Sequence, residues 1–160
     1  MTNIYPGTTV DLLWKIEHAA EAQLSVVAAK VVDELQNGPG RFCLGLVGDL
    51  GAGKTALVAV TLRALGLPLG EEVSSPTYTI CSEYQAKGFW YAHLDLYRLP
   101  QSEDIWGQLG IGETRPYRGF FVEWPERDAS LALEMTHLLN IEFAHGSETR
   151  NYAFFRSRPV

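Results

Sequence analysis

GDLGAGKT, residues Gly48–Thr55, decides the fold, and it lies inside FCLGLVGDLGAGKTALVAVTLRALG, residues Phe42–Gly66. It fits the pattern G-x-x-x-x-G-K-[ST], in which glycines let backbone N–H groups approach phosphate oxygens. The apolar run FCLGLV predicts a buried strand, and KTALVAVTLRAL predicts a helix that ends just before Gly66. Because the N-terminus of such a helix attracts anions, we expect a nucleotide's phosphates at Asp49, Leu50, Gly51, Ala52, Gly53, Lys54 and Thr55.

Two further carboxylates are candidates for the chemistry of this loop. In the pattern, Lys54 reaches the outer phosphates and Thr55 offers its hydroxyl to Mg²⁺. Such a site also needs an acidic residue at the end of a neighbouring strand. Asp95 ends the run FWYAHL and Glu123 ends FFV, so both are candidates, and the alternative for each is a salt-bridged strand end.

Thr77 and His93 are less decisive candidates. Thr77 lies in SSPTYT and could sense a γ-phosphate as a switch loop does, or belong to an ordinary polar turn. His93 alternates with Asp95 along an apolar run, so the two share one strand face. That placement leaves His93 either a core residue or a functional one.

The remaining pattern predicts one α/β domain over residues 18–160. Helical spacing covers residues 18–36, a strand pair covers 77–84 and 89–97, and a short helix covers 101–110. Residues 119–124 read as a buried strand, and 137–144 and 151–156 as two late strands. Residues 1–17 show no firm period and are expected to be an N-terminal extension.

Composition narrows the class of partner. The chain has 160 residues and a net charge of −6, with 13 lysines and arginines that are dispersed. That balance argues against a protein that grips nucleic acid alone. No apolar run approaches a membrane span and no signal peptide is visible, so we expect no membrane contact and a cytoplasmic location. Cys43 and Cys81 lie in apolar runs and are expected to be free thiols.

The loop alone leaves the use of the nucleotide open. No N-K-x-D or T-K-x-D motif is present, so ATP is favoured over GTP. A small-molecule kinase remains an alternative, with Arg115 and Arg118 as possible lid residues over the phosphates. A nonenzymatic nucleotide switch is the other alternative.

The ordered motifs GDLGAGKT, SPTYT, HLDLYRL and EWPER resemble the TsaE (YjeE) family, the bacterial ATPase subunits of tRNA threonylcarbamoyladenosine synthesis. EDIWGQLGIGE is similar to a further family segment through Glu103, Leu109, Gly110 and Glu113. The resemblance implies a three-layer P-loop NTPase-like α/β domain with a mixed, mainly parallel sheet. It implies ATP and Mg²⁺ as ligands, Thr55 and Glu123 on the metal side, Asp95 essential for hydrolysis, and Thr77 in a switch-like loop.

The resemblance also implies partners. A heterodimer of the threonylcarbamoyl transferase and its paralogue would modify adenosine 37 of tRNA, and the ATPase would support its turnover while meeting tRNA only indirectly. Glu21 and Arg150 correspond to regions from which the family reaches the nucleotide. The chain departs from the family in a longer stretch before the loop, QNGPGRFCLGLV, and in the first 17 residues. Arg98 is expected on the strand face opposite Asp95, where it could meet the partner.

Overall fold

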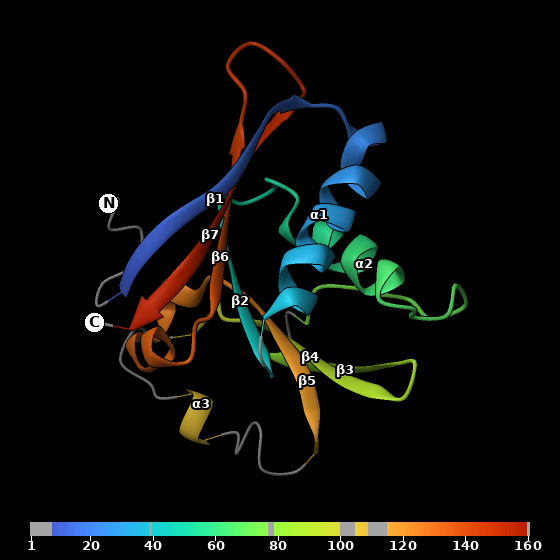
Figure 1. Ribbon diagram of the computed structural model, residues 1–160, viewed down its shortest axis with the longest axis vertical. Coiled ribbons are helices and arrows are strands. Elements are labelled where there is room, and N and C mark those ends of the chain that lie inside the picture. The colour runs from blue at the N-terminus through green and yellow to red at the C-terminus, as the bar shows by residue number, and fades with distance from the viewer. Residues whose placement is uncertain (1–7, 39, 77–78, 100–104, 109–114, 160) are drawn as a thin grey trace.

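A seven-stranded mixed sheet organises the molecule (Figure 1). The structure, a computed structural model, describes residues 8–38, 40–76, 79–99, 105–108 and 115–159. Strand order is β1-β7-β6-β2-β5-β4-β3. The strands are β1 Thr8–Ala19, β2 Phe42–Val47, β3 Cys81–Ala86, β4 Phe89–Asp95, β5 Tyr117–Glu123, β6 His137–Phe143 and β7 Arg150–Pro159. The helices are α1 Leu24–Asn37, α2 Lys54–Ala64 and α3 Ile105–Gln108, with 3-10 turns η1 Glu21–Gln23, η2 Pro125–Arg127 and η3 Ala129–Leu133.

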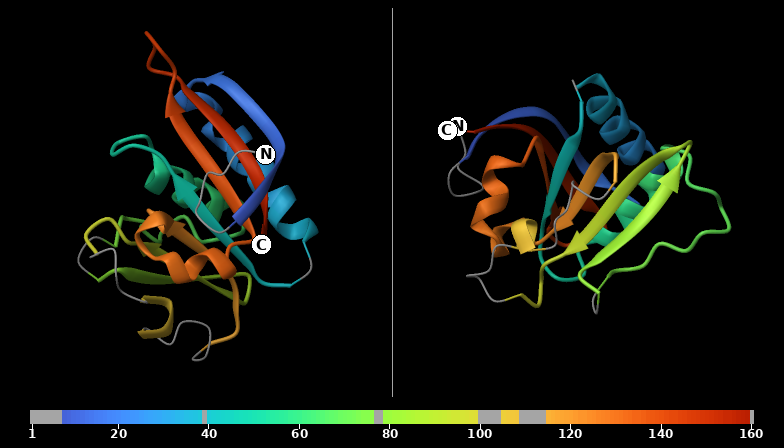
Figure 2. Two further views of the ribbon diagram at one scale, coloured as in Figure 1. Left: turned by 90° about the vertical axis from the view of Figure 1, so that its left-hand side faces the viewer. Right: turned by 90° about the horizontal axis from the view of Figure 1, so that it is seen from below.

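The four central strands are parallel and the outer ones are not. β2 pairs with β5 and β6, and β5 with β4, all in parallel, whereas β3, β7 and β1 are added antiparallel. Helices α1 and α2 cover one face, and η2 and η3 lie against the other (Figures 1 and 2). The arrangement is therefore the expected three-layer α/β domain with a mixed sheet.

Alternation along β2 divides the core in two. Phe42, Leu44 and Leu46 pack into the cluster under α1 and α2, while Cys43 belongs to the cluster under η3. Both faces of β2 are thus covered, as the nearly continuous apolar run predicted. Gly66 adopts a positive φ just past α2, and the Leu67 N–H donates to the Leu62 carbonyl, so that expected helix end is confirmed.

The N-terminal segment is the main correction. Residues 8–17, expected to be an extension, form most of β1, which pairs antiparallel with β7 at the edge of the sheet. The expected helix from residue 18 begins only at Leu24, after η1. Two register shifts along β1, at Leu12/Trp14 and at Ile16/Ala19, disturb its alternation of side chains. An edge strand with bulges carries a weak period-2 signal, which explains why sequence periodicity missed it.

The hairpin expected in residues 77–97 is present but shorter. β3 begins at Cys81 and pairs with β4 across a two-residue turn at Lys87 and Gly88. Cys43 and Cys81 are free thiols, as expected. Some residues named in the sequence analysis lie outside the described residues: Thr77, Glu103, Leu109, Gly110, Glu113 and residues 1–7. Among the described helices, none has both the length and the apolar character needed to cross a membrane.

Candidate functional site

The glycine loop joins the end of β2 to the start of α2 and is held closely by its surroundings. Gly53 has a φ of +105°, a left-handed conformation that side chains disfavour. A Cβ atom at Gly48 would lie 2.6 Å from the carbonyl oxygen of Ile141 on β6. Both positions therefore require glycine, and the loop turns its backbone toward the N-terminus of α2.

Lys54 is folded into this loop. Its side chain belongs to a residue that is only 5% exposed, and its Nζ donates to the carbonyls of Gly48 at 2.6 Å and Asp49 at 3.0 Å. The ammonium also lies 4.2 Å from the centre of the Trp124 ring, a cation–π contact. Burial lowers the pKa of Lys54, while nearby carboxylates, Glu123 first, oppose that shift. The loop thus holds a cation at its centre.

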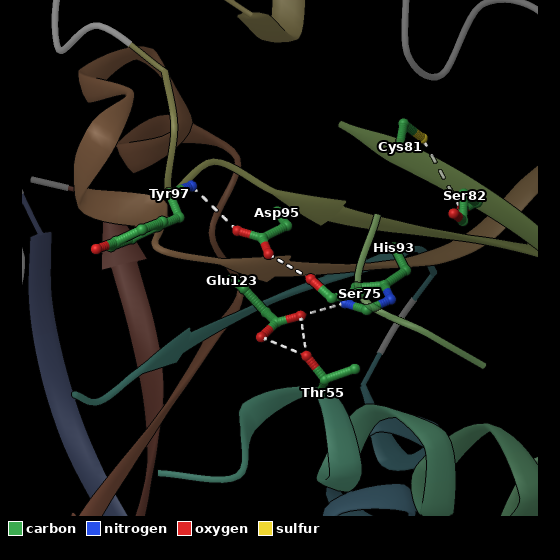
Figure 3. A network of polar contacts seen from close by, with 8 residues as sticks. All are labelled: Thr55, Ser75, Cys81, Ser82, His93, Asp95, Tyr97 and Glu123. Atoms are coloured by element: carbon green, nitrogen blue, oxygen red, sulfur yellow. Dashed lines mark hydrogen bonds and ion pairs between the residues drawn. The ribbon is translucent and has the colours of Figure 1, made fainter. Parts of the chain in front are cut away.

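Glu123, at the end of β5, faces the first turn of α2 (Figure 3). The Thr55 hydroxyl lies 3.0 Å from Glu123 Oε1 and 2.9 Å from Oε2. The Nε2 atom of His93, on β4, lies 2.6 Å from Glu123 Oε2. Both His93 and Glu123 are buried, at 0% and 3% exposure. A hydroxyl, a carboxylate and an imidazole from three elements therefore form one contact chain.

Asp95 is the register partner of Glu123 on the neighbouring parallel strand. Its Oδ2 accepts a hydrogen bond from the Ser75 hydroxyl at 2.6 Å, and its Oδ1 accepts one from the Tyr97 N–H at 3.0 Å (Figure 3). The described residues show no salt bridge to Asp95 or to Glu123 other than the His93 contact. The structure brings both predicted carboxylates to the same edge of the sheet.

A cavity of about 450 Å³ lies beside these groups. Its lining contains seven of the predicted site residues: Leu50, Gly51, Gly53, Lys54, Thr55, Asp95 and Glu123. Arg98 also lines it, contrary to the expectation that Arg98 lies on the opposite face. The reason is that β4 ends at Asp95, so the strand alternation used for that prediction does not extend to Arg98.

Glu21 and Arg150 come together at a second cavity of about 280 Å³, which shares Gly53 with the first. Ala52 lines it as well, and its carbonyl accepts a hydrogen bond from Arg150 Nε at 3.1 Å. The guanidinium of Arg150 lies 4.0 Å from the Phe143 ring centre. The two predicted residues, which are far apart in sequence, thus border the loop from the same direction.

Asp49 contacts Lys54 through its carbonyl but lines a different hollow. It lines a larger hollow of about 810 Å³ along the β6 side of the loop, which includes Gly48 but not Lys54, Thr55, Asp95 or Glu123. We place the candidate chemistry in the cavity of about 450 Å³, because Lys54, Thr55, Asp95 and Glu123 all line it.

Comparisons with known proteins agree with this geometry. The sequence profile of the family described as "Threonylcarbamoyl adenosine biosynthesis protein TsaE" matches residues 18–152. The chain belongs to the TsaE family. That family takes part in tRNA threonylcarbamoyladenosine biosynthesis, and the resemblance seen in the motifs is confirmed.

Three TsaE proteins illustrate the similarity. The tRNA threonylcarbamoyladenosine biosynthesis protein TsaE of Synechocystis sp. is 47% identical over 85 residues, which are 51% of this chain and 53% of that protein. The protein of the same name from Haemophilus influenzae is 36% identical over 105 residues, 61% of each chain. That from Nostoc sp. is 48% identical over 108 residues, 64% of this chain and 62% of the other. The chain therefore spans somewhat more than half the length of these curated relatives.

A solved structure supports the fold. The crystal structure of Bacillus subtilis YdiB matches with a TM-score of 0.62 at 22% identity, over 92% of this chain and 87% of that one. At this identity the likeness concerns the fold alone. It confirms the P-loop-like α/β fold class expected from the sequence.

Two TsaE motifs contribute residues that sequence reasoning did not assign to the site. Trp124 of EWPER lies under Lys54, and Tyr97 of HLDLYRL supplies a backbone donor to Asp95. Ser75, in the SPT segment, bonds Asp95. The only available signal was their position within the motifs, since no spacing rule predicts a lysine over an indole.

Proposed function

We propose that this chain is a Mg²⁺-dependent ATPase that supports tRNA threonylcarbamoyladenosine synthesis by binding and hydrolysing ATP in complex with the threonylcarbamoyl transferase heterodimer. Participation in the pathway comes with the TsaE family. The ATP chemistry and the partnership are inferences from the site and from the resemblance. The proposal implies a cytoplasmic location, where the chain would meet tRNA through its partners.

One observation carries the proposal: the contact chain Thr55–Glu123 beside Lys54 and the glycine loop. Mg²⁺ prefers oxygen ligands and is usually held by one or two carboxylates together with substrate phosphates, not by an all-protein cage. The described residues contain no group of three or more His, Cys, Asp or Glu that could form such a cage, which is consistent with that mode. Thr55 and Glu123 would hold the ion, which would neutralise charge on the phosphates when bound.

The remaining residues have roles that follow from their positions. Lys54 would bind the outer phosphates as a point charge. Asp95, anchored by Ser75 and by the backbone at Tyr97, would orient the attacking water. Glu21 and Arg150 would lie on the nucleoside side, at the second cavity. Thr77 stays a prediction, because it lies outside the described residues.

The two arginines named for the kinase alternative are engaged elsewhere in the structure. Arg115, a possible lid residue, forms a salt bridge of 2.8 Å with Glu83 and lies 4.0 Å from the Trp90 ring centre. Arg118 donates to the carbonyl of Gly40 at 2.7 Å. Neither arginine lines the cavity beside Lys54.

Partner dependence is tested by ATP turnover of the chain alone, the heterodimer alone and the mixture. We expect turnover in the mixture to exceed the sum of the separate rates, and only with Mg²⁺. Lys54→Ala is the matched inactive control, because it removes the point charge from a side chain that faces the loop and leaves the core clusters unchanged. Fast turnover by the isolated chain would contradict partner dependence. Equal ATP affinity of the wild type and Lys54→Ala would contradict the site.

A further inference from the structure

His93 is a buried histidine that the proposed function has not yet used. It lies on β4 with no exposed surface, two residues before Asp95 on the same strand face. Its Nε2 atom lies 2.6 Å from Glu123 Oε2 (Figure 3). This buried contact is slightly shorter than an ordinary N–H···O hydrogen bond, and hydrogen bonds to carboxylates are shorter and stronger than bonds between neutral groups.

The proton of this hydrogen bond can be assigned from the surroundings. A carboxylate only accepts, so His93 Nε2 carries the proton and donates it to Glu123. The other ring nitrogen, Nδ1, is buried and has no hydrogen-bond partner among the described residues. We therefore assign the proton of this contact to Nε2.

Glu123 depends on this donor because its other partner is shared. The single proton of the Thr55 hydroxyl faces both carboxylate oxygens, at 3.0 and 2.9 Å, and can be donated to only one of them at a time. The His93 N–H is committed to Oε2. Oε1 thus keeps the greater capacity to accept a further ligand, on a carboxylate whose orientation is fixed from the β4 side.

We propose that His93 is a positioning residue for Glu123: its Nε2–H holds the buried carboxylate turned toward Thr55. The inference rests on the proposed function, since it deepens the role of Glu123 as a metal-side carboxylate. Hydrogen-bond partners of metal-binding groups typically contribute roughly 10–100-fold to metal affinity or activity. His93 is expected to contribute in this range without touching the nucleotide.

The test compares nucleotide affinity with and without metal. The affinity of a non-hydrolysable ATP analogue is measured by calorimetry with excess Mg²⁺ and with EDTA, and the ratio of the two is the readout. His93→Phe removes the donor and is expected to lower this ratio about 10–100-fold, with the EDTA affinity nearly unchanged. His93→Gln is expected to restore most of the ratio, because its amide nitrogen is the same number of bonds from Cα as Nε2. His93→Asn, which is too short to reach Glu123, should behave like His93→Phe and replaces it if the phenylalanine variant does not fold.

A matched control and a double mutant isolate the mechanism. His137 is also a buried histidine. It lies at the first residue of β6 and lines neither of the two cavities beside the glycine loop. His137→Phe should keep the wild-type ratio at pH 7.5. If His93 acts through Glu123, adding His93→Phe to Glu123→Gln should lower the ratio no further.

The outcomes separate the inference from the function on which it rests. A wild-type ratio in folded His93→Phe or His93→Asn would overturn the positioning role. So would an equal loss in His137→Phe, or a folded His93→Gln that restores nothing. If the wild type itself binds the analogue no better with Mg²⁺ than with EDTA, the proposed magnesium function fails, and the inference fails with it.

Discussion

At the scale of single residues, Asp95 and Glu123 stand one strand apart but are held by different donors. Asp95 is bonded by a serine hydroxyl and a backbone N–H, whereas Glu123 meets a threonine hydroxyl and a histidine. The difference fits the proposed roles, in which Asp95 would orient water and Glu123 would lie on the metal side.

Amide substitutions should separate hydrolysis from binding. We expect Glu123→Gln and Asp95→Asn each to reduce partner-stimulated turnover by about 10²–10³-fold, because a group that acts where charge develops stabilises mainly the transition state. The ATP concentration at half-maximal rate should change much less for Asp95→Asn, and for Glu123→Gln it should rise by no more than the roughly 10–100-fold expected from the weakened metal side. Steady-state kinetics with the heterodimer measure both quantities, and Glu72→Gln, an exposed acidic site, is the matched control. A wild-type rate in Glu123→Gln would reduce that carboxylate to a structural role.

His137 makes stability sensitive to acid. Burial, with the charge of Arg156 adding to it, lowers the pKa of His137 from 6.5 to about 4. The unfolded chain therefore takes up a proton below about pH 6.5 that the folded chain refuses until near pH 4. The contribution of His137 to the free energy of unfolding is fully present above pH 6.5. It is lost as the pH falls, by about 2 kcal/mol between pH 7 and 5.

Urea unfolding at pH 7 and pH 5 measures this loss. His137→Phe keeps an aromatic ring against Phe154, whose centroid lies 5.4 Å away, and has no titrating group. The variant should lose about 2 kcal/mol less than the wild type over the same interval. Equal losses in the two proteins would show that His137 does not govern the acid response.

Much of the site was predictable from residue patterns, and the rest was not for a physical reason. The loop residues and both strand-end carboxylates follow from local motifs and from the rule that parallel strands end at one edge. The contact between His93 and Glu123 joins residues 30 positions apart. This contact depends on the register of β4 against β5, which cannot be predicted from the sequence of either strand alone. The same applies to Trp124 beneath Lys54.

At the scale of elements, buried strands and covered helices were predicted better than edges. β2 and β5 have both faces in the core, and α2 has one whole face there. Their apolar patterns are therefore strong. β1 is an edge strand with two register shifts, and its segment was mistaken for an extension. An edge strand has a single hydrogen-bonded neighbour, so packing restricts its sequence less than that of a central strand.

Packing between β2 and β5 gives a prediction at this scale. Gly119 and Phe42 are register partners, and a Cβ atom at Gly119 would lie 2.1 Å from the Phe42 ring. The ring itself is confined by Tyr91 and Phe121, with centroids 6.1 and 5.4 Å away. Gly119→Ala should therefore cost about 1–3 kcal/mol of unfolding free energy, as overpacking of a filled core does.

Gly70→Ala is the matched control for this substitution. A Cβ atom at Gly70 meets nothing within 4 Å, so the change should stay within about 0.5 kcal/mol. Chemical denaturation of both variants at pH 7 measures the difference. Equal stability of the two variants would show that the Phe42 ring moves aside at no cost.

At the scale of the whole molecule, strand order explains where the site lies. β2 has a parallel neighbour on each side, β5 and β6. The loop after β2 therefore lies between the carboxyl-terminal ends of these two strands. Open α/β sheets bind ligands outside such ends. The mixed sheet was expected, but this order could not be read from the sequence, because it depends on which distant strands pair and not on the pattern within any one of them.

The charge of the molecule gives the last prediction, that this chain alone does not bind tRNA. Its net charge is −6, and a polyanion is bound chiefly by neutralising phosphates with clustered lysine and arginine. Several of its arginines are also engaged within the fold, since Arg115 pairs with Glu83 and Arg158 pairs with Asp11. Nonspecific nucleic-acid binders typically show dissociation constants of about 10⁻⁴–10⁻⁶ M at physiological salt, so we expect weaker binding than that range. A fluorescence titration of labelled tRNA at near-physiological salt measures it for the chain alone, the heterodimer and the mixture. If the chain only joins its partners, the mixture should bind tRNA through the heterodimer, and micromolar binding by the chain alone would show a direct tRNA contact in its place.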